Sequence, residues 1–139
     1  MDKVKFNMLL VIAMVVVSGE FHGSMAKEHT VGDEFGWAKP PSESFYRWWA
    51  GHETFRINDV LVFNFTNGAH TVAEVANRAY DDCDDSNPIS IHQHSPVRLT
   101  IQGDSYYIST KGSDCKMGMK LSITVVSAES NISSPAPTH

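Results

Sequence analysis

The sequence predicts an all-β fold, a Greek-key β-sandwich of two sheets with one short helix. Several short stretches alternate apolar and polar residues, which is typical of strands that bury one face. Turn-forming dipeptides separate these stretches, as they do in sandwiches and barrels. The chain has 139 residues and no internal repeat, which indicates one domain around one buried core.

The elements follow one another in a simple order. The first clear strand covers residues 60–66, where Leu61, Phe63 and Phe65 share one face. Residues 76–82 are predicted to form the short helix. Alternating strands are expected at 97–102 and at 121–126, each with its aliphatic residues on one face. Four dipeptides mark turns: Asn67-Gly68, Ser95-Pro96, Gly103-Asp104 and Lys111-Gly112.

Composition and charge exclude several classes of function. The chain has 11 Lys and Arg against 16 Asp and Glu, a formal net charge of -5, so no basic patch is available for nucleic acid. Four acidic residues cluster near the predicted helix, but they lack the spacing of a calcium loop, and a solvated loop is favoured: Asp81, Asp82, Asp84 and Asp85. No catalytic motif is present, and we expect a protein that is not an enzyme.

Both ends of the chain have the composition of segments outside a folded domain. Residues 1–26 are expected to be a cleaved signal peptide, because Lys3 and Lys5 precede an apolar run and small residues around Ala26 suit a signal peptidase. A membrane anchor is the alternative, but a span needs about 20 apolar residues. Residues 128–139 contain Ser and Pro and are expected to be a disordered tail. We therefore expect a secreted, extracellular protein with no transmembrane segment in the mature chain.

Two sequons, at Asn64 and Asn131, permit N-glycosylation of a secreted chain. If the aromatic face of the strand at 60–66 is the core, Asn64 points outward and is accessible to the modifying enzyme.

A loop near the C-terminal end, from Ser109 to Met119, carries the most specific pattern in the chain. Asp114 follows Ser109 by five positions and Met119 follows Asp114 by five, with Cys115 directly after Asp114. This spacing, together with His70 in "GAHTVAEV", resembles the copper-binding frame of the phytocyanins, which are plant cupredoxins. Other segments also resemble this family: "HTVGDEFGW", "FRINDVLVFNFTNGAHTV", "CDDSNPIS" and "GMKLSITVV".

The resemblance extends to stellacyanin-type, uclacyanin-type and early nodulin-like proteins, and it implies a cupredoxin-like domain over residues 27–127. It also implies roles for four positions. His70 stands at the first imidazole ligand and Met119 at the weak axial ligand, whereas Ser109 stands where the family has its thiolate and Asp114 where it has its second imidazole.

Ligand chemistry then argues against a blue-copper centre. A Ser hydroxyl stays protonated at neutral pH and cannot replace the thiolate, and a carboxylate prefers harder cations than copper(I). The remaining set of His70, Asp114 and Met119 could hold copper(II) or zinc only loosely. We therefore expect no cofactor, with weak copper binding as the alternative. His70 and Met119 have a second interpretation, as residues kept for hydrogen bonding and for packing.

The two cysteines, Cys83 and Cys115, are expected to form a disulfide, because the chain is secreted and the even count leaves no thiol over. The competing interpretation has Cys115 free and acting as the missing copper ligand, which would leave Cys83 unpaired. His92 and His94 could chelate a metal from one face of a strand, but a solvated hairpin tip is favoured because no third ligand lies nearby in sequence.

Two functions follow from these observations. The favoured one is an extracellular, non-redox binding module, monomeric, whose partner is a cell-surface protein or a glycan. The alternative is the family's one-electron transfer through an altered metal site. Four aromatic residues could form the recognition surface or could pack over the end of the sandwich: Phe45, Tyr46, Trp48 and Trp49.

Overall fold

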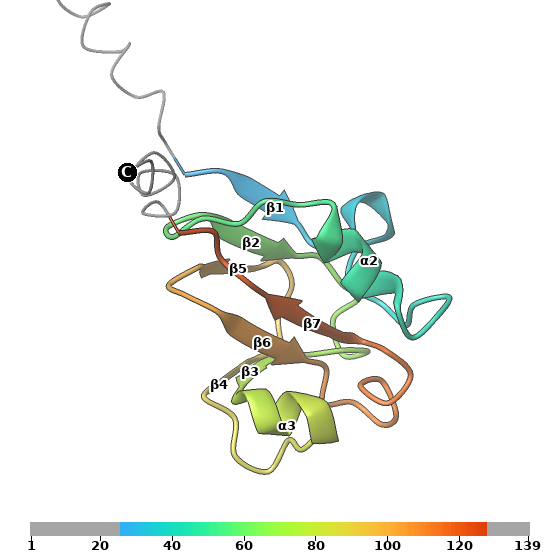
Figure 1. Ribbon diagram of the computed structural model, residues 1–139. Coiled ribbons are helices and arrows are strands. Elements are labelled where there is room, and N and C mark those ends of the chain that lie inside the picture. Colours follow the sequence, from blue (N-terminus) through green and yellow to red (C-terminus); the bar gives the residue numbers. More distant parts are fainter. Residues whose placement is uncertain (1–25, 128–139) are drawn as a thin grey trace, which may run out of the picture.

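The computed structural model describes residues 26–127, which form two β-sheets with short helices beside them (Figure 1). One sheet has the strand order β1-β2-β5, and the other has the order β4-β3-β6-β7. The strands are β1 (Glu28–Thr30), β2 (Val60–Phe63), β3 (Val72–Val75), β4 (Ser90–His92), β5 (Val97–Thr100), β6 (Ser105–Ile108) and β7 (Lys120–Ile123). Strands β1 and β2 run parallel, and the other neighbouring pairs are antiparallel. The predicted two-sheet all-β fold is confirmed.

The core between the sheets is built from the alternating residues of the strands. Leu61 and Phe63 of β2 are fully buried, as are Leu121 and Ile123 of β7, and Ile101 closes the core just after β5. Because side chains alternate across a strand, the residues between them reach the other face of each sheet. The predicted core faces of these strands are confirmed.

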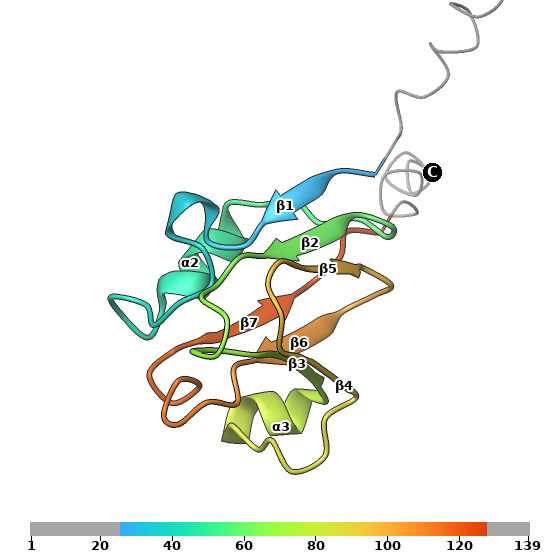
Figure 2. The same cartoon turned by 180° about the vertical axis from the view of Figure 1, so that it is seen from behind.

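The helices lie at the edges of this core (Figures 1 and 2). The predicted helix is α3 (Asn77–Asp82), which begins one residue later than expected. The structure also contains α2 (Phe45–Gly51) and a 3₁₀ turn, η1 (Asp33–Phe35), which the prediction did not include. Helix α2 packs beside β7, whereas α3 packs on β6.

Helix α2 exists because two of its aromatic residues reach the core. Tyr46 and Trp49, three positions apart, lie on one face and are buried. The Tyr46 hydroxyl donates to the carbonyl of Gly36 at 2.7 Å and accepts from the backbone N–H of Ala38 at 2.9 Å. Burial raises the pKa of Tyr46 far above its ordinary value, so this hydroxyl remains a donor. Of the four aromatic residues considered as a recognition surface, Tyr46 and Trp49 pack in the core and Phe45 is partly buried. Trp48, at 61% exposure, is the one that is exposed.

A buried cluster of hydrogen-bonded side chains links β1 to the segment before β2. His29 in β1 contacts Glu53 through Nδ1 and Asp59 through Nε2, each at 2.8 Å. Asp59 also accepts the backbone N–H groups of Lys27 and Arg56, each at 3.0 Å. This cluster completes the end of the sheet that contains β1 and β2.

Candidate functional site

The four predicted site residues come from two loops next to strands of the larger sheet. His70 precedes β3, Ser109 follows β6 directly, and Asp114 and Met119 lie in the loop that leads into β7. The loop is closed by its own backbone: Met119 N–H donates to the carbonyl of Asp114 at 2.9 Å, and Ser109 N–H donates to that of Met119 at 3.2 Å. The two ends of the loop, Ser109 and Met119, therefore lie next to each other.

Two features hold this loop against the rest of the domain. Cys115 is bonded to Cys83 at the end of α3, which confirms the predicted disulfide and leaves no free cysteine among residues 26–127. Gly118 has φ +106°, and a Cβ there would lie 2.6 Å from the Cα of Glu43. Only glycine tolerates both that conformation and that contact. The loop is thus positioned by a covalent link on one side and close backbone packing on the other.

The centre of the site is a hydrogen-bonded triad of side chains. Asp114 Oδ2 accepts a bond from the Ser109 hydroxyl at 2.7 Å and contacts His70 Nδ1 at 2.7 Å. Ser109 and Asp114 are only 2% and 3% exposed. Because a carboxylate oxygen only accepts, both His70 Nδ1 and Ser109 Oγ donate to it. Ser109, Asp114 and His70, which the resemblance places at ligand positions, are therefore bonded to one another through one carboxylate oxygen.

Two threonines extend this network, and the sequence analysis did not single them out. Thr71 N–H donates to Ser109 Oγ at 3.2 Å, and Thr110 N–H donates to Thr71 Oγ1 at 2.7 Å. The carbonyl of Thr71 accepts the indole N–H of Trp37 at 2.8 Å. The signal that could have found them is their position, since each directly follows a predicted site residue. Thr71 and Thr110 thus bond each other and link Ser109 to the backbone that follows His70.

Met119 lies in the main hydrophobic core. Its side chain is 0% exposed and packs with the cluster that includes Trp37 and Tyr46. A thioether surrounded in this way is filling space between large aromatic groups.

The donor atoms of this site do not match a type 1 copper centre. Ser109 offers a hydroxyl that donates a hydrogen bond to Asp114, not a thiolate, and the sulfur of neighbouring Cys115 is held in a disulfide. Within residues 26–127, no group of three or more His, Cys, Asp or Glu side chains is arranged to hold a metal ion.

The triad also differs from a hydrolytic Ser-His-Asp arrangement. Catalysis of that kind needs the imidazole between the hydroxyl and the carboxylate, so that it can take the hydroxyl proton. Here the carboxylate of Asp114 lies between Ser109 and His70, and the hydroxyl is buried. The geometry offers no activated nucleophile at this position.

The other predicted sites lie apart from the triad. His92 in β4 pairs with Val72 in β3, and His94 lies beyond the strand and is exposed. The predicted hairpin tip is wrong, because β4 and β5 belong to different sheets and the segment between them crosses from one sheet to the other. Asp84 accepts the N–H and hydroxyl of Ser86, and these bonds lower its pKa. Asp81 and Asp82 end α3, and the acidic residues after Cys83 belong to a local turn. Asn64 is exposed just after β2, whereas Asn131 lies outside the described residues, as do residues 1–25 and 128–139.

No helix among residues 26–127 has the length and apolar character that crossing a membrane requires.

Comparison with known proteins agrees with the fold. A family model described as a plastocyanin-like domain matches residues 37–119. A blue copper protein of Arabidopsis thaliana is 41% identical over 123 residues, which cover 87% of this chain and 59% of that protein. The peeling cupredoxin of Cucumis sativus is 42% identical over 114 residues, or 79% of this chain and 83% of that one.

A solved structure of cucumber stellacyanin with Cu²⁺ at pH 7.0 superimposes on this chain with a TM-score of 0.68 at 40% identity. The match covers 75% of this chain and 99% of that one. Early nodulin-like protein 14 of Arabidopsis thaliana is 36% identical over 122 residues, which cover 85% of this chain and 67% of that protein. The chain belongs to the plastocyanin-like phytocyanin family.

Proposed function

We propose that this phytocyanin has no type 1 copper centre and acts outside the cell as a non-enzymatic binding module. The observation that carries the proposal is Asp114 Oδ2, which accepts hydrogen bonds from both Ser109 and His70. The atoms that a copper ion would need are thereby used to bond one another. The partner we propose is an extracellular protein or glycan.

The chemistry of the donor set supports the loss of copper. A hydroxyl that donates to a buried carboxylate is a hard, protonated group, whereas the blue centre depends on a soft thiolate. To act as an anionic ligand in place of a thiolate, the Ser109 hydroxyl would have to lose its proton, and coordination through Asp114 Oδ2 would compete with the two hydrogen bonds it accepts.

The same hydrogen bonds give the loop a metal-free means of support. His70 and Asp114 join segments that are 44 positions apart, and Ser109 is bonded to Asp114 across the base of the loop. Retention of the fold without a metal ion is consistent with a role that uses the surface of the domain.

The test is a copper(II) titration of the protein secreted by a eukaryotic host that expresses the full reading frame. We expect no intense visible thiolate-to-copper band and no reversible redox wave at stoichiometric copper. Cucumber stellacyanin, treated identically, serves as the positive control. Either signal in this protein would overturn the proposal.

One-electron transfer through an altered site is the second candidate, favoured by relatives that are named blue copper proteins. His70 Nε2 has no hydrogen-bond partner among residues 26–127, so one imidazole nitrogen is open to a ligand. This function predicts a reversible redox wave without the thiolate band. Voltammetry during the same titration separates the two candidates, and a His70→Gln variant shows whether any wave depends on that imidazole.

A further inference from the structure

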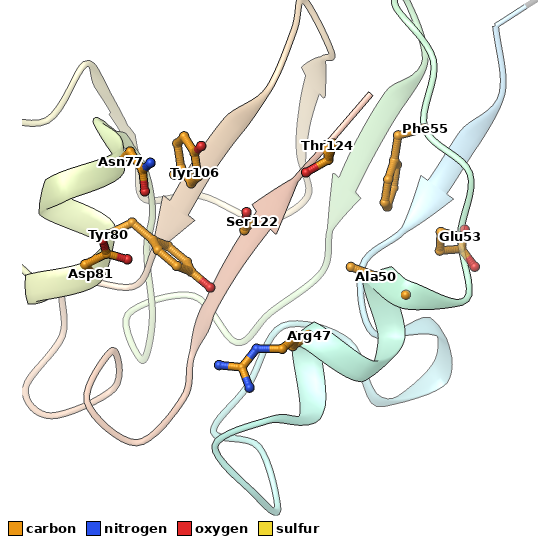
Figure 3. Close-up of a pocket in the computed structure, with 11 residues that line it drawn as sticks. Arg47, Ala50, Glu53, Phe55, Asn77, Tyr80, Asp81, Tyr106, Ser122 and Thr124 are labelled. Atoms are coloured by element: carbon orange, nitrogen blue, oxygen red, sulfur yellow. The ribbon is translucent and has the colours of Figure 1, made fainter. Parts of the chain in front are cut away.

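A groove lies between α2 and α3, over the outward faces of β6 and β7 (Figure 3). Its volume is about 550 Å³, within the range of about 300–1,000 Å³ that is usual for small-molecule sites. None of the triad residues lines it, so it is separate from the former metal frame. We infer that this groove binds a neutral carbohydrate chain.

Two tyrosines form the aromatic part of the groove. Tyr80 from α3 and Tyr106 from β6 have ring centroids 5.5 Å apart and planes inclined by 49°, and both are half-buried. Lys120 steadies Tyr80, because its Nζ lies 4.5 Å from the ring centroid and donates to the Tyr80 carbonyl at 3.0 Å. A sugar ring presents an apolar C–H face, and a partly exposed tyrosine ring is a flat apolar surface on which that face can lie.

Unpaired polar groups surround these rings. Arg47 on α2 and Asn77 and Asp81 on α3 are exposed, and Figure 3 shows the Arg47 side chain directed across the groove toward Tyr80. Among residues 26–127, the side chains of these three residues have no hydrogen-bond or ion-pair partner. Burial raises the pKa of Tyr80, so its hydroxyl is neutral and also able to donate.

The mixture of donors and acceptors selects a polyhydroxylated ligand over the other classes. Asp81 would repel an anion, whereas Arg47 would repel a cation. An apolar ligand would cover these polar groups without pairing them, which is unfavourable. Sugar hydroxyls both donate and accept, so they can satisfy the carboxylate, the amide and the guanidinium together.

This inference rests on the proposed binding role and names the chemistry of the partner. Its failure is distinguishable from failure of that role as a copper-free module, because the copper titration does not involve the groove. A colourless protein that binds no sugar would overturn only the groove assignment. A blue protein that binds sugar through the groove would overturn only the absence of copper.

The test is a titration of the full secreted protein with neutral oligosaccharides of glucose, galactose, mannose or arabinose, followed by amide chemical shifts in NMR. We expect at least one of them to shift the amide signals of α3, β6 and β7 in a saturable manner. Tyr80→Ala and Arg47→Ala should each weaken that binding about tenfold, because each removes a central contact.

Trp48→Ala is the matched control, since Trp48 is an exposed aromatic residue of α2 that does not line the groove. It should leave binding unchanged. Arg47→Ala keeps the proposal testable if Tyr80→Ala does not fold, because Arg47 is exposed and has no hydrogen-bond or ion-pair partner among residues 26–127. The inference is overturned if no neutral sugar binds, if only acidic oligosaccharides or peptides bind, or if Trp48→Ala weakens binding as much as Arg47→Ala.

Discussion

Two histidines of this domain contact carboxylates at almost the same distance, yet their surroundings differ. The His29 side chain is 0% exposed, and both its ring nitrogens lie 2.8 Å from carboxylate oxygens of Glu53 and Asp59. The His70 side chain is 15% exposed and bonds one carboxylate, that of Asp114, through one nitrogen. Both nitrogens of the first imidazole have partners, whereas Nε2 of the second has none among residues 26–127.

This difference indicates that His29 has a structural role, whereas His70 could still bind a ligand. Each ring nitrogen of His29 is already hydrogen-bonded to a carboxylate oxygen, one of Glu53 and one of Asp59. This imidazole links β1 to the segment that precedes β2, and it has no ring nitrogen left to bind a further ligand. His70 keeps that capacity, and its partner Asp114 stands where the resemblance places an imidazole.

The largest effect is expected from restoring the copper ligands around His70. Ser109→Cys combined with Asp114→His replaces the hydroxyl and the carboxylate by a thiolate and an imidazole at the spacing of the family. Copper(II) should then produce an intense visible band that the unaltered protein lacks. Absorption spectroscopy measures this change.

Adding His70→Gln to that double variant should remove the band, whereas adding His92→Gln, a histidine remote in sequence from the loop, should not. Circular dichroism checks that each variant is folded. A folded double variant that stays colourless would show that this loop does not superimpose on a copper frame.

A smaller effect is expected from the same substitution at the two histidines. His29→Gln removes a buried imidazole that bonds both Glu53 and Asp59 and should lower the free energy of unfolding by about 3 kcal/mol. His70→Gln removes one bond from a carboxylate that still accepts from Ser109, and about 1 kcal/mol is expected. Urea unfolding at neutral pH measures both. Equal losses at the two sites would contradict the distinction between them.

The smallest effect is expected in the loss of stability at acid pH. Burial alone would raise the pKa of Asp59, but hydrogen bonds from His29 and from the backbone N–H groups of Lys27 and Arg56 lower it below its ordinary value. A carboxyl group with a lower pKa in the folded state contributes stability that is fully present above its unfolded-state pKa. That contribution is lost as the pH falls through the folded-state pKa.

The unaltered protein should therefore lose stability below about pH 4 more steeply than Asp59→Asn, in which this group cannot titrate. Urea midpoints measured along an acid series report the slope. Asp84→Asn is a suitable comparison, because the pKa of that exposed carboxyl is also lowered but its bonds are local to one turn. Parallel acid profiles for the unaltered protein and Asp59→Asn would contradict the assignment.

Much of this fold could be predicted from local pattern. The alternation of Leu61 with Phe63, and of Leu121 with Ile123, identifies the buried faces because the period of a strand is intrinsic to its backbone. Helix α2 could not be predicted in this way. Aromatic residues such as Trp48 and Trp49 are weak helix formers, and the helix is stabilised by burial of Tyr46 and Trp49 against distant segments.

The candidate site, like the fold, could be predicted from the sequence only in part. The sequence by itself determined the loop, its missing thiolate and the residues at each position of the frame, because spacing along a chain is a covalent property. Only the tertiary structure decided that Asp114 accepts from both Ser109 and His70, and that Arg47, Tyr80 and Tyr106 border one groove. Hydrogen bonds and grooves join residues that are distant in sequence, and their geometry exists only when the core has brought those segments together.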